Sequence, residues 1–143
     1  MVVLNPNNWH WVDRNTLPWT KEYMEALDLS VSCDPHTVRI ARVDTVSGDS
    51  NVSQRKGKVI CYFDLDVTFA VEVAETESGD SVCNGTVRVP ELMHDEQDFE
   101  IRVEGFGDHT AQVQQVFVPA LREALGRYQE DLIAQHSKDV QQT

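Results

Sequence analysis

The sequence VICYFDLDVTFAVEV, residues 59–73, decides the fold of this chain. All of its odd positions carry apolar side chains, whereas its even positions are mostly polar or small, as at Asp64, Thr68 and Glu72. Successive side chains of a β-strand point to opposite faces, so this alternation predicts a strand with one buried and one solvated face. A strand of this length spans about 50 Å at roughly 3.3 Å per residue. We therefore expect an elongated domain built on a long antiparallel sheet.

Further strands are predicted on both sides of this stretch. Residues 37–46, TVRIARVDTV, precede it, and the segments 85–89 and 99–104 follow it after a turn at ETESGDS, residues 75–81. The segment SCDPH, residues 32–36, combines proline with other turn-forming residues and is expected to break the chain before the first strand.

A helix is predicted at each end of this series of strands. The first covers residues 17–29, where apolar side chains recur at every fourth position. The second covers residues 119–136, where they recur at three- and four-residue spacing. Pro119 either opens the second helix or kinks a longer one that begins near Ala111. The order of helix, strands and helix indicates the α+β class.

Length, charge and cysteine usage restrict the function classes. The chain has 143 residues and a net charge of −12, which fits a single domain, 1–143, that nucleic acid and anionic membranes repel. No apolar run is long enough for a membrane-spanning helix. Three scattered cysteines, Cys33, Cys61 and Cys83, suit reduced thiols in the cytoplasm better than a disulfide framework.

The sequence offers no recognisable catalytic or metal-binding arrangement. The segment HDEQDFE, residues 94–100, is interpreted as a solvated acidic loop, because no other residues join it at metal-ligand spacing. Cys61 lies on the inward phase of the long strand and is interpreted as a core thiol. Asp64 and Asp66 lie on the outward phase, where contact with water is expected to leave the acidity of both carboxylates unshifted. We therefore expect no enzyme activity and no cofactor.

The first unusual segment is NPNNWHWVD, residues 5–13. A tryptophan side chain can bury roughly 200 Å², so two of them close together are expected to be removed from water by some contact. Two interpretations stay open: Trp9 and Trp11 are folded down as part of the domain core, or the segment contacts another molecule.

The second unusual segment is QRKGKVI, residues 54–60. No acidic residue lies between Asp49 and Asp64, although the chain as a whole is strongly acidic. The bases of this segment are Arg55, Lys56 and Lys58. Such an island of positive charge indicates an anionic partner surface, but ordinary solvated lysines near a hairpin would give the same pattern.

The two segments together resemble the N-terminal domain of the activator of heat-shock protein 90 ATPase, a co-chaperone family. The family has an opening of the form NxNNWHW and an RKxK motif inside its sheet, and in this chain the second segment follows the first by about 45 residues. Four further stretches resemble the family in the same order, so that the similarity covers essentially the whole chain: LPWTKEY, GDSNVSQRKGKVI, VRVPEL and EDLIAQHSKDVQ.

The resemblance implies a fold and a function. The implied fold is an elongated α+β domain with an N-terminal helix, a meandering four-stranded antiparallel sheet and a C-terminal helix. The implied function is that of a co-chaperone, which binds the middle segment of heat-shock protein 90 and stimulates its ATPase by favouring the closed, catalytically competent state. The N-terminal segment of the chaperone is a second candidate contact. A monomer is expected in isolation.

The resemblance also implies roles for individual residues. Asp49 is expected to meet a lysine of the chaperone, and Ile60 and Tyr62 to add apolar contact. The basic motif is expected to bind the chaperone and to position its catalytic loop: Arg55, Lys56 and Lys58. The opening motif is expected to serve full stimulation more than docking: Asn5, Asn7, Asn8, Trp9, His10 and Trp11.

Two points depart from the family pattern. His94 stands where an aromatic contact residue is expected. Full-length members continue into a linker and a second domain, whereas this sequence ends at Thr143, so it is either a piece of such a protein or a one-domain relative. A rival interpretation is an autonomous holdase that binds unfolded chains through exposed aromatic residues.

Overall fold

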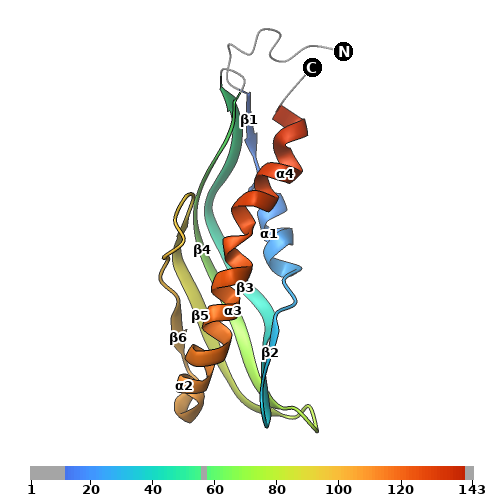
Figure 1. Cartoon of the computed structure of the whole chain (residues 1–143), viewed down its shortest axis with the longest axis vertical. Coiled ribbons are helices and arrows are strands. Elements are labelled where there is room, and N and C mark those ends of the chain that lie inside the picture. The colour runs from blue at the N-terminus through green and yellow to red at the C-terminus, as the bar shows by residue number, and fades with distance from the viewer. Residues whose placement is uncertain (1–11, 56–57, 141–143) are drawn as a thin grey trace.

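The computed structural model describes residues 12–55 and 58–140. One antiparallel sheet runs the length of an elongated molecule, and the helices lie along it (Figure 1). Six strands form this sheet in the described part of the chain: β1 (Val12–Asn15), β2 (Ser30–Cys33), β3 (His36–Arg55), β4 (Lys58–Glu75), β5 (Ser81–Met93) and β6 (Arg102–Glu104).

Strand β4 confirms the period-two alternation that predicted it. Its inward side chains from Phe63 to Val73 are no more than 2% exposed, whereas Ile60 and Tyr62 on the outward phase are exposed. Strand β3 pairs with β4 along almost its whole length and has 20 residues, twice the predicted 37–46. Its second half, SGDSNVSQR, is too polar to be recognised as a strand, and pairing with β4 and β1 keeps it extended.

The predicted meander is present as β3, β4, β5 and β6 in sheet order. The sheet nevertheless has more than the four predicted strands, because β1 and β2 both pair with the outer edge of β3. The SCDPH segment interrupts the chain only as a hairpin turn, since Cys33 and His36 are paired across it. Both added strands are only four residues long, which leaves little periodicity to detect.

The first helix, α1 (Leu17–Glu25), is shorter than the predicted 17–29. It begins where the Asn15 carboxamide oxygen accepts a hydrogen bond from the Leu17 amide, at 3.1 Å. Beyond its end, the Leu29 carbonyl accepts a hydrogen bond from the Ile40 amide of β3 at 3.0 Å. The residues after Glu25 therefore form a turn and a short connection that leads into β2 at Ser30 instead of extending the helix.

The C-terminal helical region begins well before Pro119, as the longer of the two alternatives predicted. It contains a π-helical turn that ends at Phe117, two residues before that proline, which has no N–H to donate to the carbonyl four residues earlier. Its segments are η1 (Gly107–His109), α2 (Thr110–Gln112), η2 (Val113–Phe117), α3 (Val118–Gly126) and α4 (Tyr128–Val140).

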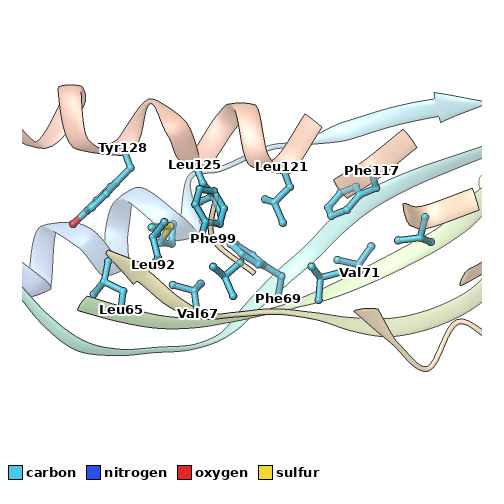
Figure 2. Packing of buried hydrophobic residues seen from close by; sticks show 14 of the residues in the cluster. Leu65, Val67, Phe69, Val71, Leu92, Phe99, Phe117, Leu121, Leu125 and Tyr128 are labelled. Atoms are coloured by element: carbon cyan, nitrogen blue, oxygen red, sulfur yellow. The ribbon is translucent and has the colours of Figure 1, made fainter. Parts of the chain in front are cut away.

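The core lies between the inner face of the sheet and the helices α3 and α4. Figure 2 shows Leu65, Val67 and Phe69 of β4 facing side chains of the helical region. The helical partners in this layer, all buried, are Phe117, Leu121, Leu125 and Tyr128.

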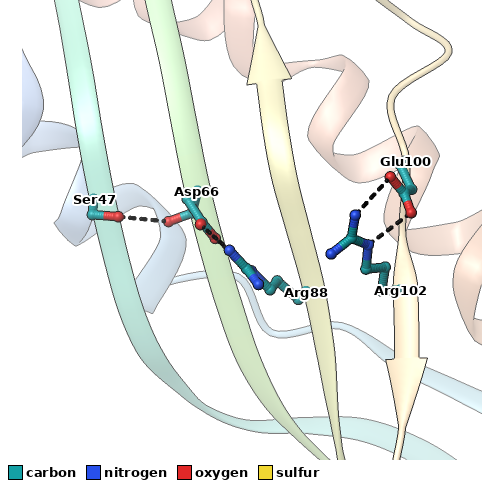
Figure 3. Close-up of polar contacts among 5 residues, drawn as sticks. All are labelled: Ser47, Asp66, Arg88, Glu100 and Arg102. Atoms are coloured by element: carbon teal, nitrogen blue, oxygen red, sulfur yellow. Dashed lines mark hydrogen bonds and ion pairs between the residues drawn. The ribbon is translucent and has the colours of Figure 1, made fainter.

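The other face of the sheet is solvated and carries ion pairs (Figure 3). Arg88 donates two hydrogen bonds to Asp66, one of them 3.0 Å long, and Arg102 pairs with Glu100. The hydrogen bonds from Arg88 hold the pKa of Asp66 below its usual value. The expectation of an unshifted pKa for Asp66 is therefore wrong, because Arg88 of the neighbouring strand β5 faces its carboxylate across the sheet.

Candidate partner-binding surface

The solvated face of the β3–β4 hairpin brings several of the predicted contact residues together. Residues directly opposite each other in an antiparallel pair share one face. Four such pairs run from the hairpin connection inward: Arg55 with Lys58, Ser53 with Ile60, Asn51 with Tyr62, and Asp49 with Asp64. We call the surface formed by Asp49, Asn51, Ser53, Lys58, Ile60, Tyr62 and Asp64 the hairpin face.

Two large apolar side chains lie side by side at its centre. Ile60 is 42% exposed and Tyr62 is 44% exposed. Lys58 is exposed on the side nearer the connection, and Asp49 is exposed on the opposite side. The hairpin face thus presents a cation, an apolar centre and a pair of carboxylates in sequence along the strands, which is a pattern for polar and apolar contact with one partner.

His94 extends this surface beyond β4. Its ring centroid lies 5.1 Å from that of Tyr62 and 6.1 Å from that of Phe63. Its backbone amide donates to the Phe63 carbonyl at 3.2 Å, which fixes the residue against β4. The sequence put His94 in place of an expected aromatic residue, and the structure sets its flat ring beside the apolar centre.

A buried cluster of hydroxyl groups supports the hairpin face from below. Ser50, next to the exposed Asp49, has its Oγ 2.7 Å from the Thr16 hydroxyl and 2.8 Å from the Tyr128 hydroxyl. The Thr20 hydroxyl contacts that of Tyr128 at 2.5 Å. These contacts connect β3 to α1 and α4 and fix the backbone that carries Asp49. They join residues up to 108 positions apart, so no local sequence pattern could reveal them.

Cys61 lies on the inner face between Ile60 and Tyr62 and is half-buried. Burial, together with the nearby negative charge of Asp95, raises the pKa of its thiol to about 11. The thiol is therefore protonated at neutral pH, in agreement with its interpretation as a core thiol.

Part of the predicted site lies outside the described residues. This applies to Lys56, to the side chain of Arg55 and to the whole opening motif: Asn5, Asn7, Asn8, Trp9, His10 and Trp11. Within residues 12–55 and 58–140, no three histidine, cysteine or acidic side chains are grouped to hold a metal ion. None of the described helices is both long and apolar enough to span a membrane.

Comparison with known proteins assigns the family. The family model described as "Activator of Hsp90 ATPase, N-terminal" matches residues 13–136. The chain belongs to this family. The resemblance noted from the sequence is thereby confirmed, whereas the roles of individual residues in the hairpin face stay predictions.

Relatives in the family differ in how much of their length the chain matches. The "Hsp90 co-chaperone HCH1" of Saccharomyces cerevisiae is 48% identical over 99% of this chain and 99% of its own length. The "Hsp90 co-chaperone AHA1" of the same yeast is 34% identical over 99% of this chain but only 44% of its own length. Among solved structures, Aha-1 of Plasmodium falciparum superposes with a TM-score of 0.78 at 23% identity, covering 89% of this chain and 91% of that one. This last similarity confirms the α+β fold.

Proposed function

We propose that this protein is an Hsp90 co-chaperone that stimulates the chaperone's ATPase and has no ATPase of its own. The names of its relatives, among them two yeast Hsp90 co-chaperones, support the partner. The observation that carries the proposal is the position of the exposed Ile60 and Tyr62 beside Lys58, the described lysine of the RKxK motif, in a chain of this family. A cytoplasmic location is part of the proposal.

The chemistry of the hairpin face specifies its complement on the chaperone. Lys58, with Arg55 and Lys56 of the same motif, would meet carboxylates. Ile60, Tyr62 and the ring of His94 would meet an apolar patch. Asp49 would meet a lysine. We assign this complementary surface to the middle segment of Hsp90, because the family resemblance implies that docking site.

Stimulation requires that the co-chaperone distinguish two states of the chaperone. Only a higher affinity for the closed, catalytically competent state shifts the population toward it. A tenfold stimulation requires about 1.4 kcal/mol of such preference. A few desolvated charge contacts and one apolar anchor can supply that amount. Docking of oppositely charged surfaces also predicts an association that weakens with salt.

The opening motif has a separate role in this proposal. Its asparagines would exchange hydrogen bonds with chaperone backbone that rearranges on closure, and Trp9 and Trp11 would add apolar contact. Loss of this motif should therefore reduce stimulation more than affinity.

The direct test is a calorimetric titration of the purified protein against isolated middle and N-terminal segments of Hsp90, at low and high salt. We expect binding to the middle segment that weakens as salt rises, and faster ATP turnover by the full-length chaperone. Absence of binding to either segment would refute the proposal. Suppression of aggregation of an unfolded client without Hsp90 or ATP, at either salt concentration, would favour the holdase instead.

A further inference from the structure

A groove separate from the hairpin face lies between the loop of residues 94–99 and the helices α3 and α4. Its volume is about 550 Å³, within the range of sites that hold a ligand or an anchoring side chain. The floor is apolar and includes Leu92, Leu125 and Ile133. Figure 2 shows Leu92 and Leu125 on the two sides of this end of the core. An apolar side chain entering the groove would thus be removed from water.

The rim of the groove is acidic. Its carboxylates come from the loop and from the first turn of α4: Asp95, Glu96, Asp98 and Glu130. In the part of the chain that the structure describes, none of them forms an ion pair with a base. The nearby Arg122 donates to the Phe99 carbonyl at 2.6 Å instead, and Arg127 pairs with Glu123. The rim therefore carries a concentration of negative charge that a cationic ligand would neutralise.

The loop that forms the rim is held in place. The Asp95 amide donates to Gln129 Oε1 at 2.7 Å, and Gln129 Nε2 donates back to Asp95 Oδ1 at 2.8 Å. The Asp98 amide donates to Glu96 Oε1 at 3.0 Å. A wall fixed in this way needs little ordering when a ligand binds, which favours affinity.

A second cavity continues the first along α3. It measures about 530 Å³ and shares Gln97 and Gly126 with the first. Its lining includes Val118 and Pro119 together with Arg122, Glu123 and Arg127, so apolar surface continues beyond the acidic rim next to charged side chains of both signs. Two adjoining cavities suit a peptide segment better than a single ion or a small cation.

We propose that this acidic groove binds a cationic, amphipathic peptide segment of a partner protein, with a large apolar side chain on the floor and flanking lysine or arginine side chains on the rim. The apolar floor would bury the apolar side chain of the ligand. The rim carboxylates, which form no ion pair with a described base, would favour a positively charged ligand. None of the residues that line the groove belongs to the hairpin face, although the loop of the groove begins at His94, beside Tyr62. The inference does not depend on the proposed co-chaperone function.

The test is fluorescence anisotropy of a labelled 12-residue peptide with leucine and lysine at helical spacing, titrated with the full chain. The first variant neutralises the rim without changing its shape, because each amide keeps the carbonyl oxygen that accepts the loop hydrogen bonds. It combines Asp95→Asn, Glu96→Gln, Asp98→Asn and Glu130→Gln. Its matched control removes the same charge from α1 and the β4–β5 turn with Glu22→Gln, Glu25→Gln, Glu77→Gln and Asp80→Asn.

We expect the rim variant to bind the peptide about tenfold more weakly than the control variant, since several close charge contacts are lost. Equal weakening of both variants would mean attraction to net charge alone and would overturn the proposal. No measurable binding to the unmodified chain at low salt would overturn it as well.

A second variant tests the shape of the groove and leaves its charge unchanged. A Cβ built at Gly126 meets nothing within 4 Å, so a side chain can begin there without a backbone clash, and Gly126→Gln places its bulk at a residue that lines both cavities and improves helix propensity. We expect it to fold and to bind the leucine–lysine peptide several-fold more weakly, because the floor is obstructed. Unchanged affinity in the folded Gly126→Gln variant would contradict binding in the groove.

Discussion

The Tyr128 hydroxyl lies 2.8 Å from Ser50 Oγ and so connects helix α4 to the strand that carries Asp49. Both side chains are buried, and Thr16 and Thr20 complete the cluster. Among the described strands outside the hairpin, only the four-residue β1 pairs with β3 beside the hairpin face, and a hairpin by itself is only marginally stable in water, so packing against the helices should add to its support.

The Tyr128→Phe variant should therefore be less stable than the natural protein. It removes one hydroxyl group, so that the buried hydroxyls of Ser50 and Thr20 each have one hydrogen-bond partner fewer. We expect a decrease of about 1–2 kcal/mol in the free energy of unfolding, measured by urea denaturation. Tyr62→Phe, at an exposed position, is the control and should change it by less than about 0.5 kcal/mol. Equal stability of the two variants would show that the cluster does not support the sheet.

Reversal of one charge tests the basic side of the hairpin face. Lys58 is exposed, so Lys58→Glu should fold normally, but it places a negative charge where a carboxylate of the chaperone is expected. We expect roughly tenfold weaker binding to the Hsp90 middle segment at low salt and a smaller difference at high salt. The control is Lys21→Glu on the exposed part of α1, which makes the same change in net charge. Identical losses in both variants would assign the effect to net charge.

Removal of apolar contact tests the centre of the hairpin face. Ile60 and Tyr62 are both more than 40% exposed, so their truncation to alanine should cost little folding stability. If they anchor the partner, each truncation should weaken binding about tenfold, as for a moderate interface hot spot. Val82→Ala is a matched control, because Val82 is 41% exposed on a different strand. Affinity unchanged in the Tyr62→Ala and Ile60→Ala variants would place the docking surface elsewhere.

The fold was predictable from sequence where periodicity is strong. The alternation in residues 59–73 predicted β4 and its buried face. The second half of β3 was not predictable, because a run such as SGDSNVSQR becomes a strand only through pairing with its neighbours. The short β1 and β2 were missed for a similar reason, since four residues carry too little pattern.

The supporting parts of the site were beyond local sequence reasoning. The position of His94 against Tyr62 depends on the pairing of β4 with β5, where Asp64 lies opposite Met93. The Ser50 cluster unites three elements that are far apart in the chain. A local motif can therefore predict contact residues, but the residues that support their positions emerge only with the tertiary structure.

The thiol of Cys61 should react slowly with alkylating agents. Because its pKa is raised to about 11, nearly all of it is the unreactive thiol at pH 8. In a Cys33→Ser/Cys83→Ser variant, we expect the iodoacetamide rate at pH 8 to be roughly 100-fold below that of a free cysteine peptide. The rate should rise as the pH approaches 11. A rate equal to that of the peptide in the folded variant would contradict the protonated, half-buried thiol.

Deletion of residues 1–11 separates the two interpretations of the opening motif. If the motif serves stimulation, the shortened chain should keep its affinity for the Hsp90 middle segment within about threefold, while the ATPase stimulation falls by about tenfold or more. If the tryptophans belong to the domain core, affinity, stimulation and melting temperature should fall together, because lost burial of two large rings destabilises the whole domain. Calorimetric titration, steady-state ATP turnover and thermal unfolding of the same preparation distinguish these outcomes. The substitution of Trp9 and Trp11 by alanine in the chain without the deletion is the matched variant, since it keeps the asparagines and so reveals which residue type the stimulation requires.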